Sequence, residues 1–115
     1  MSLSMKTRKF ENVVVFDLSG KLTIGDAVMQ MRESLRSEVN GGARKFILNL
    51  GDVSYIDSSG LGELVSSYTT IRGKGGDVKL LNLTTKSKDL LQMTKLLTVF
   101  DTYDDEAKAV AALKG

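Results

Sequence analysis

The sequence predicts a single α/β domain with a mixed, mostly parallel sheet of four to five strands and about four helices. Short apolar runs rich in β-branched residues alternate along the chain with segments whose apolar residues recur at helical spacing. Strands that alternate with helices favour parallel pairing through right-handed crossovers. The length of 115 residues fits one domain. We therefore expect the element order ββαβαβαβα, with the domain covering residues 10–115.

Residues 1–9 are expected to form a tail ahead of the domain. Lys6, Arg8 and Lys9 form a dense basic cluster there, and no aromatic platform or basic helical stripe accompanies it. A solvated tail is therefore a better interpretation than a nucleic-acid-binding arm. Residues 1–3 or 1–4 could derive from an expression vector, which would make Met5 the native start.

The first half of the chain predicts two strands and a helix. Residues 13–18 form a β-branched run that ends at Ser19-Gly20, which indicates a strand and a turn. Residues 21–24 would form a short second strand, so that the first strand enters the sheet as an antiparallel edge. Asp26 can cap the following helix, which ends at the glycines after Asn40. Four apolar residues would share the buried face of this helix: Val28, Met31, Leu35 and Val39.

The second half continues the alternation. Residues 46–50 indicate a buried central strand, and the helix that follows carries Leu61, Leu64, Val65 and Tyr68 on one face. Further strands are predicted at residues 78–83 and 97–100, with a short helix opened by Thr84-Thr85 between them. The last helix begins at three acids, which favour the helix macrodipole rather than a metal site. Its inward residues would be Ala107, Val110 and Ala111.

The composition excludes several classes of protein. Cysteine and histidine are both absent, so the sequence excludes a disulfide, a thiol nucleophile, a zinc site of the usual kind and a Ser-His-Asp triad. No apolar run approaches the roughly 18 residues of a membrane span, and the first residues lack the apolar core of a signal peptide. We therefore expect a cytoplasmic protein without a membrane span.

The most informative stretch is residues 57–62, where an acid, two serines and two glycines separate the central strand from the second helix. Helix starts leave backbone N–H groups without partners, and Asp57, Ser58 or Ser59 can accept from them as the cap. Glycine in a first helical turn costs up to about 1 kcal/mol against alanine. The presence of two glycines, Gly60 and Gly62, suggests a need for bare backbone around the hydroxyl groups. A phosphate on one of the serines would be stabilised at this helix start.

Residues 53–62, Val-Ser-Tyr-Ile-Asp-Ser-Ser-Gly-Leu-Gly, resemble the signature of bacterial anti-sigma-factor antagonists, in the STAS domain family. The resemblance extends from about Val13 to Leu113 and implies the STAS fold. It also implies that the serine directly after the aspartate, Ser58, is phosphorylated. The unphosphorylated protein would bind an anti-sigma factor, itself a serine kinase, and so permit transcription. Phosphorylation would release that partner, and a serine phosphatase would reset the switch.

The resemblance also assigns roles to the neighbours of Ser58. Asp57 and Ser59 would orient its hydroxyl group and cap the helix. Gly60 and Gly62 would let the partner approach closely, although local turn geometry also explains glycine at both positions. Leu61 and Glu63 are expected at the rim of the partner interface, although Leu61 could belong to the core instead.

The sequence departs from the family pattern after Gly20. The family usually carries Glu, an apolar residue and Asp there, whereas this chain carries Lys21, Leu22 and Thr23. Lys21 and Thr23 are therefore expected to contact the partner in place of two acids. This change bears on the identity of the partner more than on the fold, and Lys21 would tolerate a nearby phosphate better than an acid.

Enzyme motifs are incomplete in this chain. Gly60 and Gly62 match two glycines of a dinucleotide fingerprint, but Val65 occupies the third position. A receiver domain would need an acidic cluster after the first strand, where Asp17 stands alone. A serine hydrolase would need a general base near Ser58. We therefore expect no catalytic activity and no cofactor.

Two other functions stay open at the level of sequence. One is a structural STAS subunit of a signalling scaffold or a lipid-transport complex, in which Ser58 is never phosphorylated. The other is weak nucleotide binding near the start of the second helix. The oligomeric state, the sigma factor and the upstream signal are not encoded in any motif of the chain.

Overall fold

The computed structural model describes residues 3–114 as five strands and four helices in the order ββαβαβαβα. The strands are β1 (Leu3–Phe10), β2 (Val13–Leu22), β3 (Lys45–Ile56), β4 (Asp77–Leu81) and β5 (Asp101–Tyr103). The helices are α1 (Asp26–Asn40), α2 (Ser58–Gly73), α3 (Thr85–Met93) and α4 (Glu106–Lys114). The predicted fold class and element order are confirmed. The two opening strands predicted at residues 13–18 and 21–24 are instead a single strand, β2, and the antiparallel edge strand is β1.

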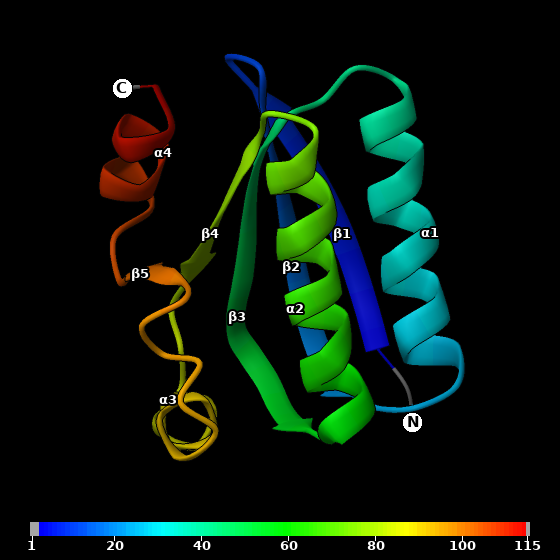
Figure 1. The fold of residues 1–115 in the computed structure, drawn as a ribbon, viewed down its shortest axis with the longest axis vertical. Coiled ribbons are helices and arrows are strands. Elements are labelled where there is room, and N and C mark those ends of the chain that lie inside the picture. Colours follow the sequence, from blue (N-terminus) through cyan, green and yellow to red (C-terminus); the bar gives the residue numbers. More distant parts are fainter. Residues whose placement is uncertain (1–2, 115) are drawn as a thin grey trace.

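The strands form one sheet in the order β1-β2-β3-β4-β5. β1 pairs antiparallel with β2, and the remaining neighbours pair in parallel. Each crossover from β2 onward moves to the next strand in the same direction, so right-handed connections place their helices on one face. Figure 1 shows α1 and α2 side by side over the sheet. The carboxyl ends of β2 and β3 therefore meet the starts of both helices at one edge.

The two faces of the sheet bury separate apolar clusters. The alternation of side chains along β2 sends Val14 and Phe16 to one cluster and Val13 and Val15 to the other. The larger cluster is built on α1, α2 and the sheet and includes three of the residues predicted for the buried face of α1: Met31, Leu35 and Val39. The fourth, Val28, is also buried. The smaller cluster lies under α4. Both faces are thus covered by helices, as a mostly parallel sheet requires.

The prediction of a tail over residues 1–9 is wrong for residues 3–9, which belong to β1. β1 and β2 are joined by Glu11 and Asn12, whose φ angles of 52° and 61° form a tight two-residue hairpin. A turn with two left-handed residues matches the twist of the strands, but it usually carries glycine. Glu11-Asn12 gives no such signal in sequence. Met1 and Ser2, part of the expected vector-derived segment, lie outside the described residues.

The strand boundaries near Gly20 and Phe100 also differ from the predictions. β2 continues through Ser19 and Gly20 because Gly20, at φ 101°, forms an irregularity in the β2–β3 register instead of a turn. Residues 97–100 form turns because Phe100 is buried against Tyr68, with ring centroids 5.2 Å apart. The strand predicted at residues 97–100 is therefore wrong, and the last strand, β5, begins directly after that segment.

The last helix buries a different face from the one predicted. Val110 is buried as expected, whereas Ala107 and Ala111 are exposed. Ala109 and Leu113 take their place against the sheet. None of the helices within residues 3–114 has the length and apolar character needed to cross a bilayer.

Candidate functional site

The candidate site is the edge of the sheet where β3 passes into α2 through one residue. β3 ends at Ile56 and α2 begins at Ser58, so Asp57 alone makes the connection. The end of β2 lies beside this connection, since Leu22 pairs with Ile56. Polar residues of the β3–α2 junction and of the loop after β2 are thus brought together.

Asp57 caps α2 and joins it to the loop after β2. Its Oδ1 accepts from the backbone N–H of Gly60 at 2.8 Å, and its Oδ2 accepts from that of Ile24 at 2.9 Å. These backbone hydrogen bonds, Ile24 first, hold the pKa of the Asp57 carboxyl below its usual range. The cap predicted among Asp57, Ser58 and Ser59 is therefore Asp57.

Ser58 is left free by this arrangement. It is the first residue of α2 and is exposed, whereas Ser59 is half-buried. Within residues 3–114 the Ser58 hydroxyl group makes no hydrogen bond, because Asp57 already supplies the cap. Its hydroxyl group is thus accessible at a helix N-terminus, where the first N–H groups and the macrodipole favour an anion.

The two glycines of the motif differ in their surroundings. A Cβ atom on Gly60 would lie 2.1 Å from the carbonyl oxygen of Leu22, so the β2 end and the α2 start require glycine there. Gly60 is buried, and the local geometry that the sequence left as an alternative explains glycine at this position. A Cβ atom on Gly62 would meet nothing within 4 Å, and Gly62 is exposed. Of the two glycines, Gly62 is the one whose backbone is exposed.

Lys21 and Thr23 lie at the same edge as Ser58. Lys21 is exposed near the end of β2 and pairs in the sheet with Tyr55 on β3. Thr23 is half-buried and sits between Leu22 and Ile24, the two residues whose backbones contact the start of α2. The structure therefore brings both residues next to the β3–α2 junction.

Leu61 and Glu63 point elsewhere. Leu61 is partly buried against the main core, the alternative left open by the sequence. Glu63 is 4% exposed, and its Oε1 accepts from Arg32 Nη2 at 2.9 Å and from Arg32 Nε at 3.1 Å. The expectation that Glu63 lies at an exposed rim is wrong, because its carboxylate is turned into the contact between α1 and α2.

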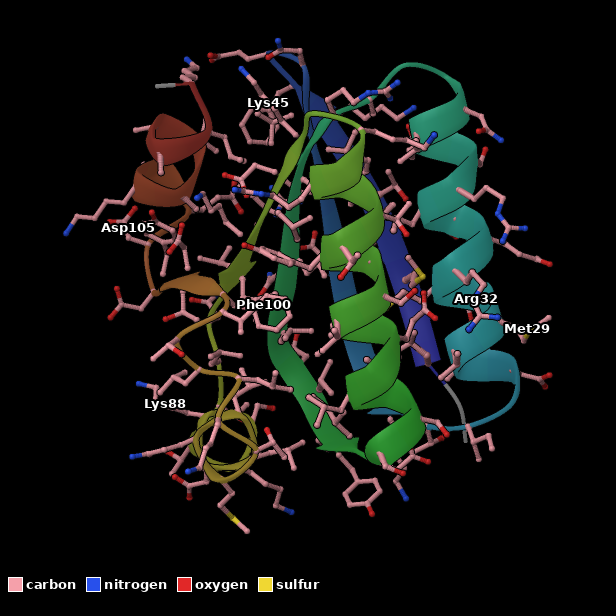
Figure 2. All side chains as sticks on the ribbon, viewed as in Figure 1. Met29, Arg32, Lys45, Lys88, Phe100 and Asp105 are labelled. Atoms are coloured by element: carbon pink, nitrogen blue, oxygen red, sulfur yellow. The ribbon has the colours of Figure 1, made fainter. Side chains whose placement is uncertain are left out.

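Two exposed apolar residues at the site were not predicted, Ile24 and Tyr55, and a third, Met29, lies on the outer side of α1. Ile24 is 75% exposed, Met29 50% and Tyr55 49%. Ile24 is tied to Asp57 through its backbone, Tyr55 precedes Asp57 by two residues, and Met29 lies near the start of α1 (Figure 2). A strand prediction for residues 21–24 concealed Ile24, since strand apolar residues are expected to be buried. Ile24 and Tyr55 together give the edge around Ser58 an apolar character.

Several known proteins are similar to this chain in sequence and in fold. The family model described as the STAS domain matches residues 4–109. The anti-sigma F factor antagonist of Paenibacillus polymyxa is 30% identical over 99% of this chain and 97% of its own length. The anti-sigma-B factor antagonist of Bacillus subtilis (strain 168) is 32% identical over 88% of this chain and 91% of its own.

A solved structure with the same fold is that of the anti-sigma factor antagonist SpoIIAA in its unphosphorylated form. It superposes with a TM-score of 0.74 at 25% identity, covering 97% of this chain and 99% of SpoIIAA. The Bacillus SpoIIAA has also been solved in a phosphorylated form, which superposes with a TM-score of 0.76 at 24% identity and covers 95% and 98% of the two chains.

Proposed function

The chain belongs to the STAS domain family, and on that premise we propose that it is an anti-sigma-factor antagonist switched by phosphorylation of Ser58. The unphosphorylated protein binds an anti-sigma factor and thereby frees a sigma factor for transcription. The anti-sigma factor is also the serine kinase that phosphorylates Ser58, and a serine phosphatase reverses the modification. The protein acts in the cytoplasm as a binding module and catalyses no reaction itself.

The observation that carries the proposal is the exposed Ser58 hydroxyl group at the start of a helix that Asp57 already caps. A serine used as a cap would have to give up its hydrogen bond to be modified. Here no such bond is broken, and the helix N-terminus favours the phosphate that results. Modification should therefore leave the fold intact.

Phosphorylation would act on binding through charge. The phosphate adds about −1.5 to −2 charges beside the Asp57 carboxylate. Ile24 and Tyr55 supply apolar surface for the partner on the same edge, and a charge placed there must lose its hydration when the partner binds. The off-state is thus a lost complex rather than an unfolded domain.

Four residues are proposed to shape the partner interface around Ser58. Lys21 and Thr23 flank the site from the end of β2, and Lys21 presents a cation where the family usually carries an acid. Gly62 leaves open backbone on α2, and Leu61 contributes whatever part of its side chain the core leaves accessible. The partner should accordingly present an acidic rather than a basic group opposite Lys21.

A phosphorylation assay tests this proposal. It combines the purified protein, an anti-sigma factor encoded in the same genome and ATP. We expect mass spectrometry to find one phosphoryl group on Ser58, with none on the Ser58→Ala variant. Ser66→Ala, an exposed serine further along α2, is the matched control and should be phosphorylated like the wild type. Affinity for the anti-sigma factor should fall at least about tenfold on phosphorylation.

The alternative function gives the opposite result. If the chain is a structural STAS subunit, Ser58 stays unmodified and Ser58→Ala is silent, while changes at Ile24 or Tyr55 break a stable assembly. An unmodified Ser58 together with undiminished binding to the anti-sigma factor would therefore refute the switch. A nucleotide sensor would instead show thermal stabilisation by a nucleotide in the absence of any partner.

A further inference from the structure

A groove of about 410 Å³ lies between α1 and α2, away from Ser58. It is lined on α1 by arginines and on α2 by hydroxyl-bearing residues that follow at helical spacing. Lys74, where α2 ends, closes one end of the groove and stands 16 residues after Ser58. At 1.5 Å per residue that end is about 24 Å along the helix from Ser58, whereas Glu63, at the other end of the groove, is about 8 Å from it.

The polar centre of the groove is the pair formed by Arg32 and Glu63. Glu63 is almost fully buried, and a buried carboxylate needs a cation and hydrogen bonds to be tolerated. Arg32 supplies them with Nε and Nη2, and the Ser67 hydroxyl group lies 3.4 Å from the other carboxylate oxygen. Arg32, labelled in Figure 2, is half-exposed, and its Nη1 makes no hydrogen bond within residues 3–114. Arg32 is thus held in place by Glu63, and its Nη1 group remains available to a ligand.

The rest of the groove is positively charged and carries further donors. Arg36, one turn after Arg32, and Lys74 are both exposed, and within residues 3–114 neither forms an ion pair. Glu63 neutralises only one of the three cations that line the groove. Ser66 and Thr70 add two hydroxyl groups on α2. These groups together favour an anion with several acceptor oxygens.

The lining also includes an apolar part. Leu35 and Val39 are buried on α1 but border the groove, so their methyl groups are available to the body of a small molecule. Pockets for small molecules typically combine such apolar contacts with a few polar groups that fix orientation. Free inorganic phosphate would use only the polar half of this lining.

We propose that the groove between α1 and α2 binds a small phosphate monoester, with the phosphate held by Arg32 and Arg36, its organic part against Leu35 and Val39, and Lys74 adding positive charge at the far end. Arginine suits this group because its planar donors match phosphate oxygens. The site is distinct from Ser58, since Ser58 is not among the residues that line the groove. Its ligand bridges the two helices that cover one face of the sheet.

Titration of the ¹⁵N-labelled full chain with phenyl phosphate at constant ionic strength tests this site. We expect saturable amide shifts on both helices, at Arg36, Ser66 and Thr70, with a Kd of about 1 mM or lower. Inorganic phosphate and phenol should each bind at least about tenfold more weakly, because each fills half of the groove. Equal affinity for phenyl phosphate and inorganic phosphate would overturn the proposal.

Arg36→Gln/Lys74→Gln provides the decisive variant. Both side chains are exposed, so the fold should persist, and affinity for phenyl phosphate should fall about tenfold. Lys86→Gln/Lys108→Gln, which removes two exposed lysines from α3 and α4, is the control and should bind like the wild type. Equal losses in both variants, or shifts centred on Ser58, would refute the groove as the site. If the double variant unfolds, Arg36→Gln alone carries the same test.

Discussion

Asp17 and Asp57 are two aspartates whose pKa values lie below the usual range, and they are held in opposite ways. Asp17 owes the shift first to hydrogen bonds from the Arg8 side chain and then to Asn49. Asp57 owes it first to the backbone N–H of Ile24 and then to that of Gly60. The first carboxylate is therefore tied to other side chains and the second to the path of the chain.

The Asp17 cluster consists of Arg8, Asp17, Asn49 and Glu106. Arg8 donates to both carboxylate oxygens of Asp17, at 2.6 and 3.0 Å, and to both of Glu106, at 2.7 and 3.1 Å. Asn49 donates to Asp17 at 2.8 Å. Arg8, on β1, is thus linked to β2 through Asp17 and to α4 through Glu106.

The Ser58 edge, defined as Ile24, Tyr55, Asp57 and Ser58, is arranged differently. Only Asp57 is used internally, and it leaves a hydroxyl group and two apolar side chains facing outward. The difference teaches how to separate structural from functional polar residues. A cluster whose charged side chains bond one another stabilises the fold, whereas an edge where one side chain bonds only to backbone leaves its neighbours free to contact a partner.

The largest effect should come from Gly60, on which the Ser58 edge depends. Gly60→Ala places a methyl group against the Leu22 carbonyl oxygen and should lower the free energy of unfolding by about 3 kcal/mol. Gly62→Ala meets open space in the same helix, so it should be neutral or stabilising by up to about 1 kcal/mol. Urea denaturation measures both, and equal effects would contradict the predicted contact.

Arg8→Met should have the next largest effect, a loss of about 2 kcal/mol in unfolding free energy, because it leaves Asp17 and Glu106 without their shared donor. Lys9→Met is the control on the same strand, since Lys9 is exposed and makes one ion pair, with Glu38. Its loss should stay within about 0.5 kcal/mol. Neither variant should change affinity for the anti-sigma factor, and a change with Arg8→Met would break the distinction between the two regions.

Ile24→Ser should show the opposite pattern, with a loss of affinity for the anti-sigma factor and little change in stability. Its side chain is mostly exposed, so the free energy of unfolding should change by less than about 0.5 kcal/mol. Affinity for the anti-sigma factor should fall about tenfold, as for an apolar contact at the centre of an interface. Val99→Ser, an exposed apolar residue before β5, should leave affinity unchanged. Calorimetric titration distinguishes the two.

Asp57→Asn sharpens the comparison within one residue. Its Oδ1 can still cap Gly60, but its amide nitrogen cannot accept from Ile24. Hydrogen exchange at the Ile24 amide should therefore accelerate severalfold, while exchange at Gly60 changes little. Equal acceleration at both amides would mean that the cap, and not only the tie to the loop, depends on the charge.

Acid pH should give the smallest difference. A lowered pKa of Asp17 contributes stability above the unfolded value, about 3.9, and that contribution is lost as the pH falls through the lower folded value. The free energy of unfolding should therefore drop below about pH 4. The drop should be shallower in Arg8→Met, because its Asp17 no longer has the first cause of the shift. Parallel curves for the two proteins would contradict this origin.

The sequence alone predicted the features that depend on local pattern. The apolar spacing of α1, the buried run of β3 and the serines at the junction of β3 and α2 all follow from periodicity and capping chemistry. The position of the candidate phosphorylation site at the end of a central strand was likewise predictable. These features need only neighbours within a few residues.

Tertiary structure decided the rest. β1 was missed because its hairpin residues, Glu11 and Asn12, take left-handed φ angles without the glycine that usually marks such a turn in sequence. Glu63 was misplaced because its partner, Arg32, is 31 residues away in sequence. Gly60 acquired its role from the Leu22 carbonyl oxygen across the sheet edge. Pattern shows which face of an element is apolar, but the identity of the atoms that meet it depends on how distant segments are packed together.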